Sequence, residues 1–226
     1  MTPAPLPLDV PLPGGDSLPG LLDGPAAARA GLVLGHGAGA GMAHPFLAQL
    51  AQGLAARGVA VLRYQFPFMA RGSRRPDPPA LAQAAVRAAV AEAARRWPGL
   101  ALFAGGKSFG GRMASQAQAA EPLAGVRGLV FVGFPLHPAR QPSIARAEHL
   151  QAVQVPMLFL QGTRDTLAEL PLVTQVAQGL GERATLHVVD GADHGFEVLV
   201  RSGRTDAAVR EELLETMAGW MLARAA

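Results

Sequence analysis

Short runs of apolar residues alternate with Ala-rich segments along most of the chain. The apolar runs predict strands at residues 31–35, 59–64, 100–105, 126–134, 155–161 and 184–189. The segments between them predict helices near residues 45–57, 80–96, 110–120, 168–180 and 206–224. Buried strands separated by helices are typical of a mostly parallel sheet with helices on both faces. The pattern therefore predicts an α/β fold.

The first 28 residues follow a different pattern. Residues 6–22 are rich in Pro and Leu and contain a Pro-Gly-Gly-Asp turn at positions 13–16. Because Pro is tolerated mainly at sheet edges, we expect an edge hairpin within residues 1–28. No internal repeat and no long linker divides the chain, so a single domain over residues 1–226 is predicted.

Composition narrows the class of protein. Half of the residues are apolar and 16% are charged, which excludes an intrinsically disordered chain. No apolar run approaches the roughly 18 residues of a membrane span. The N-terminus has neither the basic region nor the continuous apolar segment of a secretory signal. We therefore expect a cytoplasmic protein that does not act at membranes.

Charge and cysteine content exclude further classes. The pI is near 10.5, but the net charge is only +3, because nearly all the cations are arginines that do not titrate below that pH. The basic residues are scattered, so nucleic-acid binding is not expected. Without cysteine the chain has no disulfide, thiolate metal site or cysteine nucleophile. We predict neither a metal nor a cofactor.

A candidate nucleophile lies directly after the predicted strand at residues 100–105. The segment Gly106-Lys-Ser-Phe-Gly-Gly111 matches Gly-x-Ser-x-Gly and opens a predicted helix. Small residues two positions before and after the serine permit a tight strand-to-helix turn, which exposes the Ser108 hydroxyl near a helix N-terminus. The alternatives are a glycine-rich phosphate loop and a plain tight turn.

A second glycine-rich loop follows the strand at residues 31–35. The segment His36-Gly-Ala-Gly-Ala-Gly41 can bring backbone N–H groups close to a reacting carbonyl oxygen. It lacks the third glycine spacing of a dinucleotide-binding fingerprint, and no acidic residue ends the next strand, where Tyr64-Gln65 stands. We interpret His36 as a residue that braces this loop rather than as a catalytic group.

A serine nucleophile needs a base, and the base needs an acid that fixes its tautomer. Among the histidines, His194 is favoured because it lies in a polar loop after the last predicted strand, whereas His187 lies inside that strand. Asp165 is favoured as the acid because it follows a strand end. Asp193 adjoins His194, and neighbours in sequence rarely direct their side chains at each other.

The order Ser108, Asp165, His194, each after a different strand, resembles that of the α/β-hydrolase superfamily. The resemblance extends from residue 31 onward. The segments 66–69, 133–138 and 158–165 are similar to a small lidless branch that contains dienelactone-hydrolase-like proteins and eukaryotic testis-expressed and chromatin-complex homologues. Dienelactone hydrolases proper use a cysteine nucleophile, and this chain has serine there, so their substrate is not carried over.

This resemblance implies a serine hydrolase that cleaves a small carboxylic ester or related acyl bond through an acyl-enzyme. The backbone N–H groups of Phe109 and Ala38 would hold the oxyanion. The alternative is a non-catalytic interaction protein with the same fold, although a binding scaffold would not need all three groups. Only about twenty residues separate residue 134 from the next strand, too few for a helical cap, so we expect an open, shallow site that prefers short acyl chains.

The remaining candidate substrate contacts come from the loops. Phe66, Phe68 and Met69 either wall the pocket or anchor their loop, which is too Pro-rich to predict regular structure. Lys107, the only lysine, is either a base or a packed, rim or electrostatic residue. The arginines at 71, 74 and 75 either form a solvated face or meet an anionic acyl group. The other predicted contacts are His36, Gly37, Gly39 and His137.

Overall fold

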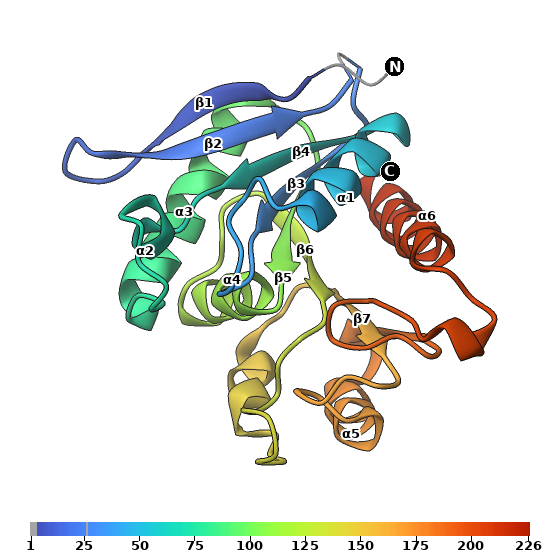
Figure 1. Cartoon of the computed structure of the whole chain (residues 1–226). Coiled ribbons are helices and arrows are strands. Elements are labelled where there is room, and N and C mark those ends of the chain that lie inside the picture. Colours follow the sequence, from blue (N-terminus) through green and yellow to red (C-terminus); the bar gives the residue numbers. More distant parts are fainter. Residues whose placement is uncertain (1–3, 26) are drawn as a thin grey trace.

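The computed structural model describes residues 4–25 and 27–226. All its strands belong to one eight-stranded sheet in the order β1-β2-β4-β3-β5-β6-β7-β8 (Figure 1). The strands are β1 Leu6–Pro11, β2 Ser17–Asp23, β3 Ala30–Gly35, β4 Val59–Tyr64, β5 Leu102–Lys107, β6 Val126–Val132, β7 Met157–Gly162 and β8 Ala184–Val189. The α-helices are α1 Pro45–Ala56, α2 Pro67–Ala70, α3 Pro79–Arg96, α4 Phe109–Ala120, α5 Leu170–Leu180 and α6 Asp206–Ala225.

Strands β3 to β8 are parallel to one another, and β1 and β2 join them as an antiparallel pair. The predicted mostly parallel sheet is therefore confirmed. The apolar runs end within two residues of the observed strands. Strands β3 to β7 are largely buried, which explains their nearly continuous apolar runs, whereas β8 is partly exposed. Part of the predicted edge hairpin, residues 1–3 and 26, lies outside the described residues.

Helices cover both faces of the sheet (Figure 1). Helices α1 and α6 pack on one face, and α3, α4 and α5 pack on the other. Helix α1 begins at Pro45, where the missing N–H costs nothing, and the side chain of His44 accepts the N–H of Phe46. Helices α1 and α6 touch closely at Gly53, since a Cβ there would lie 2.3 Å from Leu214 Cδ1.

The sequence predicted the connection from β6 to β7 correctly, but not the loop after β4. The loop after β4 was expected to lack regular structure, but it contains the short helix α2, which Pro67 initiates. The connection from β6 to β7 contains only the 3₁₀ helix η1, Ala145–Ala152, and no cap domain, as predicted.

None of the helices within residues 4–25 and 27–226 combines the length and the hydropathy that a membrane crossing requires.

Candidate active site

Ser108 lies at the sharp turn between β5 and α4. Its φ of 49° and ψ of −110° are strained for a residue with a side chain, as the sequence motif predicts. The turn is packed against the end of β3. A Cβ at Gly106 or at Gly110 would come within 2.3 or 2.4 Å of the Gly35 carbonyl oxygen. Both glycines are therefore required by close backbone approach.

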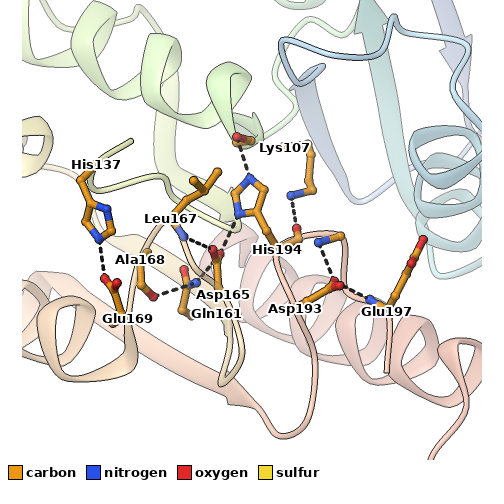
Figure 2. Close-up of polar contacts among 12 residues, drawn as sticks. Lys107, His137, Gln161, Asp165, Leu167, Ala168, Glu169, Asp193, His194 and Glu197 are labelled. Atoms are coloured by element: carbon orange, nitrogen blue, oxygen red, sulfur yellow. Dashed lines mark hydrogen bonds and ion pairs between the residues drawn. The ribbon is translucent and has the colours of Figure 1, made fainter. Parts of the chain in front are cut away.

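The structure brings the three candidate catalytic side chains together, and Figure 2 shows the contact between two of them, Asp165 and His194. The Nε2 atom of His194 lies 2.9 Å from Ser108 Oγ, and its Nδ1 atom lies 2.7 Å from Asp165 Oδ2. Each residue comes from a loop after a different parallel strand, namely β5, β7 and β8. Because the carboxyl ends of parallel strands meet at one edge, residues far apart in sequence converge there.

The Asp165 side chain is only 1% exposed and is held by three donors. Besides His194, the Gln161 side chain donates to Oδ2 at 2.6 Å and the Leu167 N–H donates to Oδ1 at 2.8 Å. Burial raises the pKa of the Asp165 carboxyl, but these hydrogen bonds and the charge of His194 outweigh it and bring the pKa below its usual value. Asp165 is therefore held as a carboxylate.

Asp193 has a different role. Its Oδ1 atom accepts the N–H groups of Gly195 at 2.8 Å and Glu197 at 3.0 Å (Figure 2). These bonds shape the loop that carries His194. The carboxyl bonded to the His194 ring is Asp165, as the sequence reasoning favoured.

The loop after β3 is braced by His36, whose side chain is fully buried. Its Nε2 atom accepts the N–H of Phe66 at 3.0 Å, so the ring proton lies on Nδ1 and is donated to the Gly37 carbonyl at 2.8 Å. Burial lowers the pKa of His36, although the backbone carbonyls of Gly37 and Ala40 raise it in part. The ring is therefore a neutral brace between two loops.

Two backbone donors near Ser108 have no acceptor among the described residues. Within residues 4–25 and 27–226, neither the Ala38 N–H nor the Phe109 N–H donates to another group of the chain. Phe109 is the first residue of α4, where N–H groups lack intrahelical partners. A Cβ at Gly37 would lie 3.9 Å from Ser108 Cβ, so the loop of Ala38 adjoins the nucleophile.

A cavity of about 530 Å³ lies beside Ser108 and His194. This volume is in the range of small-ligand sites, so the absence of a cap does not leave the serine on a flat surface. The cavity runs between the loop after β3, the start of α1 and the start of α6. Its lining includes Gly37, Ala38, Gly39, His44, Phe46, Lys107, Leu167, Phe196, Glu197, Asp206 and Arg210.

Residues 28–222 match the family model described as an alpha/beta hydrolase domain. The chain belongs to the α/β-hydrolase family. This match confirms the superfamily that the sequence motifs resemble, and the parallel sheet and the missing cap agree with it.

Solved structures show the same fold at low sequence identity. A dienelactone hydrolase from Anabaena variabilis is 20% identical, with a TM-score of 0.79 and 99% of each chain covered. A serine hydrolase without a lid from Xanthomonas campestris is 21% identical, with a TM-score of 0.75, covering 98% of this chain and 97% of that one. Est1E from Butyrivibrio proteoclasticus, with ferulic acid bound, is 15% identical, with a TM-score of 0.69, covering 93% and 99%. This α/β-hydrolase thus has the architecture of a dienelactone-hydrolase-like, lidless protein.

Several predicted substrate contacts of this α/β-hydrolase lie elsewhere. Phe66 and Phe68 are fully buried and pack edge-to-face on Phe109, and Met69 packs against the same core. None of the three lines the cavity, so the prediction that they wall it is wrong. They anchor their loop, the other interpretation left open by the sequence.

His137 and the arginines after α2 are also absent from the cavity lining. His137 is fully buried, and its Nε2 atom bonds Glu169, so its prediction as a substrate contact is wrong (Figure 2). Arg71 pairs with Asp77, whose other oxygen accepts the Phe68 N–H at 2.6 Å. Arg71 thus anchors the α2 loop instead of meeting an acyl group. His36, also predicted as a substrate contact, is fully buried and braces two loops.

The sequence reasoning missed the wall formed by α1, α6 and the loop after His194. The rings of Phe46 and Phe196 are parallel within 9°, with their centroids 6.1 Å apart. Phe196 could have been suspected because it closes the Asp-His-Gly-Phe segment. Phe46 and Arg210 carry no local signal, because they reach the cavity only through the packing of α1 and α6 on the same face.

A metal centre has no support in the described part of the chain, where no three His, Asp or Glu residues cluster closely enough to hold an ion.

Proposed function

We propose that this α/β-hydrolase is a serine hydrolase that cleaves a small carboxylic ester or a related acyl bond. The observation that carries the proposal is the continuous hydrogen-bonded chain from Ser108 Oγ through His194 to the buried Asp165 carboxylate. An imidazole with its Nδ1 proton held by a carboxylate presents an unprotonated Nε2 to the serine. This is the arrangement that a serine needs to become a nucleophile.

In the proposed reaction Ser108 Oγ attacks the ester carbonyl carbon while its proton passes to His194 Nε2. The carbonyl oxygen takes the negative charge and accepts the N–H groups of Ala38 and Phe109. The C–O bond then breaks as His194 returns the proton to the leaving alcohol, which leaves an acyl-Ser108 ester. Water, deprotonated by the same imidazole, hydrolyses this ester and restores the serine.

The cavity supports an ester of modest size. Its mainly apolar lining, with Phe46, Leu167 and Phe196 near the triad, suits the hydrocarbon part of an acyl or alcohol group. Structural relatives are described as a dienelactone hydrolase and as Est1E bound to ferulic acid, a carboxylic acid. Both descriptions agree with acyl chemistry in a site of this shape.

The test is labelling of the purified protein by a fluorophosphonate probe, together with turnover of a panel of esters, lactones and thioesters. We expect labelling of wild type and none of Ser108→Ala, with turnover reduced on the order of 10⁶-fold. Ser115→Ala is the matched control. Ser115 Oγ lies 2.8 Å from His149 Nε2, but the serine is fully buried, and the pair has no carboxylate partner.

A folded Ser108→Ala protein that still labels would contradict the proposal. A wild type that neither labels nor turns over any member of the panel would instead support a non-catalytic interaction protein of this fold.

A further inference from the structure

Lys107, the only lysine of the chain, directly precedes the nucleophile and contacts the main chain of the base. It is the last residue of β5, directly before Ser108, and its side chain lines the cavity. The ammonium group donates a hydrogen bond to the backbone carbonyl of His194 (Figure 2). It also lies 5.5 Å from the centroid of the Phe196 ring. It therefore contacts the loop of the base and not the triad side chains.

The approach of Lys107 to His194 is permitted by Gly133, at the end of β6. A Cβ at Gly133 would lie 3.1 Å from Lys107 Nζ and 3.4 Å from His194 Nδ1. The φ of Gly133 is +71°, a conformation that also favours glycine. The ammonium and the imidazole thus share one small space beside this glycine.

We propose that Lys107 is a positioning residue that fixes the backbone of His194 so that the imidazole stays in line with Ser108. This role rests on the proposed function. The Asp165 carboxylate holds the ring of His194 at Nδ1. The hydrogen bonds of Asp193 lie within the loop and do not tie it to the turn of Ser108. The lysine supplies a second contact at the main chain. A charge-assisted hydrogen bond of this kind is about twice as strong as a neutral one.

The electrostatics of Lys107 oppose a stabilising role for its ammonium group. Burial lowers the pKa of the Lys107 ammonium to about 8, although the charges of Asp165 and Asp193 act in the opposite direction. No carboxylate lies within 4 Å of Nζ among the described residues. The other titratable groups that line the cavity are His44, His194, Glu197, Asp206 and Arg210.

The lowered pKa of Lys107 affects both the stability of the protein and the strength of the hydrogen bond to His194. Below pH 8 the folded protein holds a charge that the unfolded chain solvates better, so Lys107 costs stability at neutral pH. As pH rises through about 8 the ammonium loses its proton, and the hydrogen bond to His194 becomes a weaker neutral one. Positioning of the base should therefore weaken in the same pH range.

The test compares wild type with Lys107→Met, Lys107→Gln and the control Arg127→Met. Methionine removes both charge and donor, whereas glutamine keeps a neutral N–H donor. Arg127 is exposed at the start of β6 and does not line the cavity, so its replacement removes one charge away from the site. We measure the fluorophosphonate labelling rate from pH 6 to 9.5. Over the same range we measure kcat and KM for p-nitrophenyl acetate and for a succinate monoester. The third measurement is Tm.

For Lys107→Met we expect kcat and the labelling rate to fall about 10- to 100-fold, with KM changed less than about threefold for both esters. Wild type should lose activity a few-fold as pH rises through about 8, and both Lys107 variants should lack this decrease. Lys107→Gln should recover part of kcat, and Tm of Lys107→Met should rise by a few degrees at pH 7. Arg127→Met should behave as wild type.

Three results would overturn the proposal. A Lys107→Met protein that labels at the wild-type rate across the pH range would show that the base needs no second contact. A lower Tm would make Lys107 a structural residue, and an increase in KM for the succinate monoester alone would make it a substrate-binding cation. A wild type that does not label contradicts the proposed function itself, and this role with it.

Discussion

The Oδ2 atom of Asp165 lies 2.7 Å from Nδ1 of His194. Every other neighbour of this carboxyl is also a donor, as the bonds from Gln161 and Leu167 show. The surroundings of Asp165 therefore require a hydrogen-bond acceptor at this position. An asparagine amide placed at Oδ2 would direct its two N–H bonds at the donors of Gln161 and His194.

Asp165→Asn should lower turnover by roughly 10⁴-fold without loss of the fold, because the amide favours the wrong tautomer of His194. The measurement is kcat for a p-nitrophenyl ester, with circular dichroism to check folding. Asp193→Asn is the matched control and should cost less than about tenfold, since Asp193 bonds the turn and not the ring. Equal losses in the two variants would contradict the assignment of Asp165.

The protein should lose stability as pH falls below about 6.5. Burial lowers the pKa of His149 to about 4, with help from the Arg112 charge, and burial also lowers the pKa of His36. Below the ordinary histidine pKa of about 6.5, these histidines bind protons in the unfolded chain but not in the folded one. The free energy of unfolding therefore decreases as pH falls. We expect Tm at pH 4.5 to lie several degrees below its value at pH 7.

His149→Gln removes one of the two groups and should reduce this difference in Tm. His44→Gln, at an exposed position, is the control variant and should leave the difference unchanged. A His149→Gln protein with the full wild-type pH dependence would show that other groups control acid unfolding.

Arg63 and Asp23 form a buried ion pair that tethers the loop after β3. Both side chains are 1% exposed, with Arg63 Nη2 2.7 Å from Asp23 Oδ2, and Arg63 Nη1 donates to the Met42 carbonyl at 2.8 Å. Arg63→Met should cost about 3–5 kcal/mol in urea unfolding, because it leaves the Asp23 carboxyl buried without a partner. The double variant Asp23→Leu/Arg63→Met should recover much of this loss.

Acyl-chain length tests the cavity. Each methylene that enters it can gain about 0.8 kcal/mol, whereas a methylene left in water gains nothing. For p-nitrophenyl esters from acetate to palmitate, kcat/KM should therefore peak at short or medium chains and not climb to palmitate. A maximum at the longest chains, or activation by lipid droplets, would indicate a covered hydrophobic pocket that the connection from β6 to β7 does not provide.

Much of the fold was predictable because the central strands β3 to β7 are largely buried on both faces. The run at residues 31–35 contains no polar side chain and is followed by a glycine-rich loop, so its end is visible in the sequence. The elbow at Ser108 was predictable for a similar local reason, since its glycines are demanded by the backbone of Gly35. The convergence of Asp165 and His194 followed from their places after parallel strands.

The cavity wall was not predictable, because it depends on which face of the sheet each helix covers. Phe68 and Phe46 have similar sequence contexts, because each follows a proline at or just after the start of a helix. The first is buried under α2 against Phe109, and the second faces the cavity beside Phe196. Only the packing of α1 against α6 separates these outcomes.

That packing has a mechanical consequence for selectivity. Helices α1 and α6 flank the cavity with their first turns and touch near Gly53 and Leu214, where there is no room for one more carbon. We expect a change in helix separation at this contact to move Phe46 and Arg210 at the cavity, because each of them lies on one of the two helices. Substitutions at this remote contact could therefore widen or tilt the entrance, and retune which substrates enter, without altering any atom that touches them.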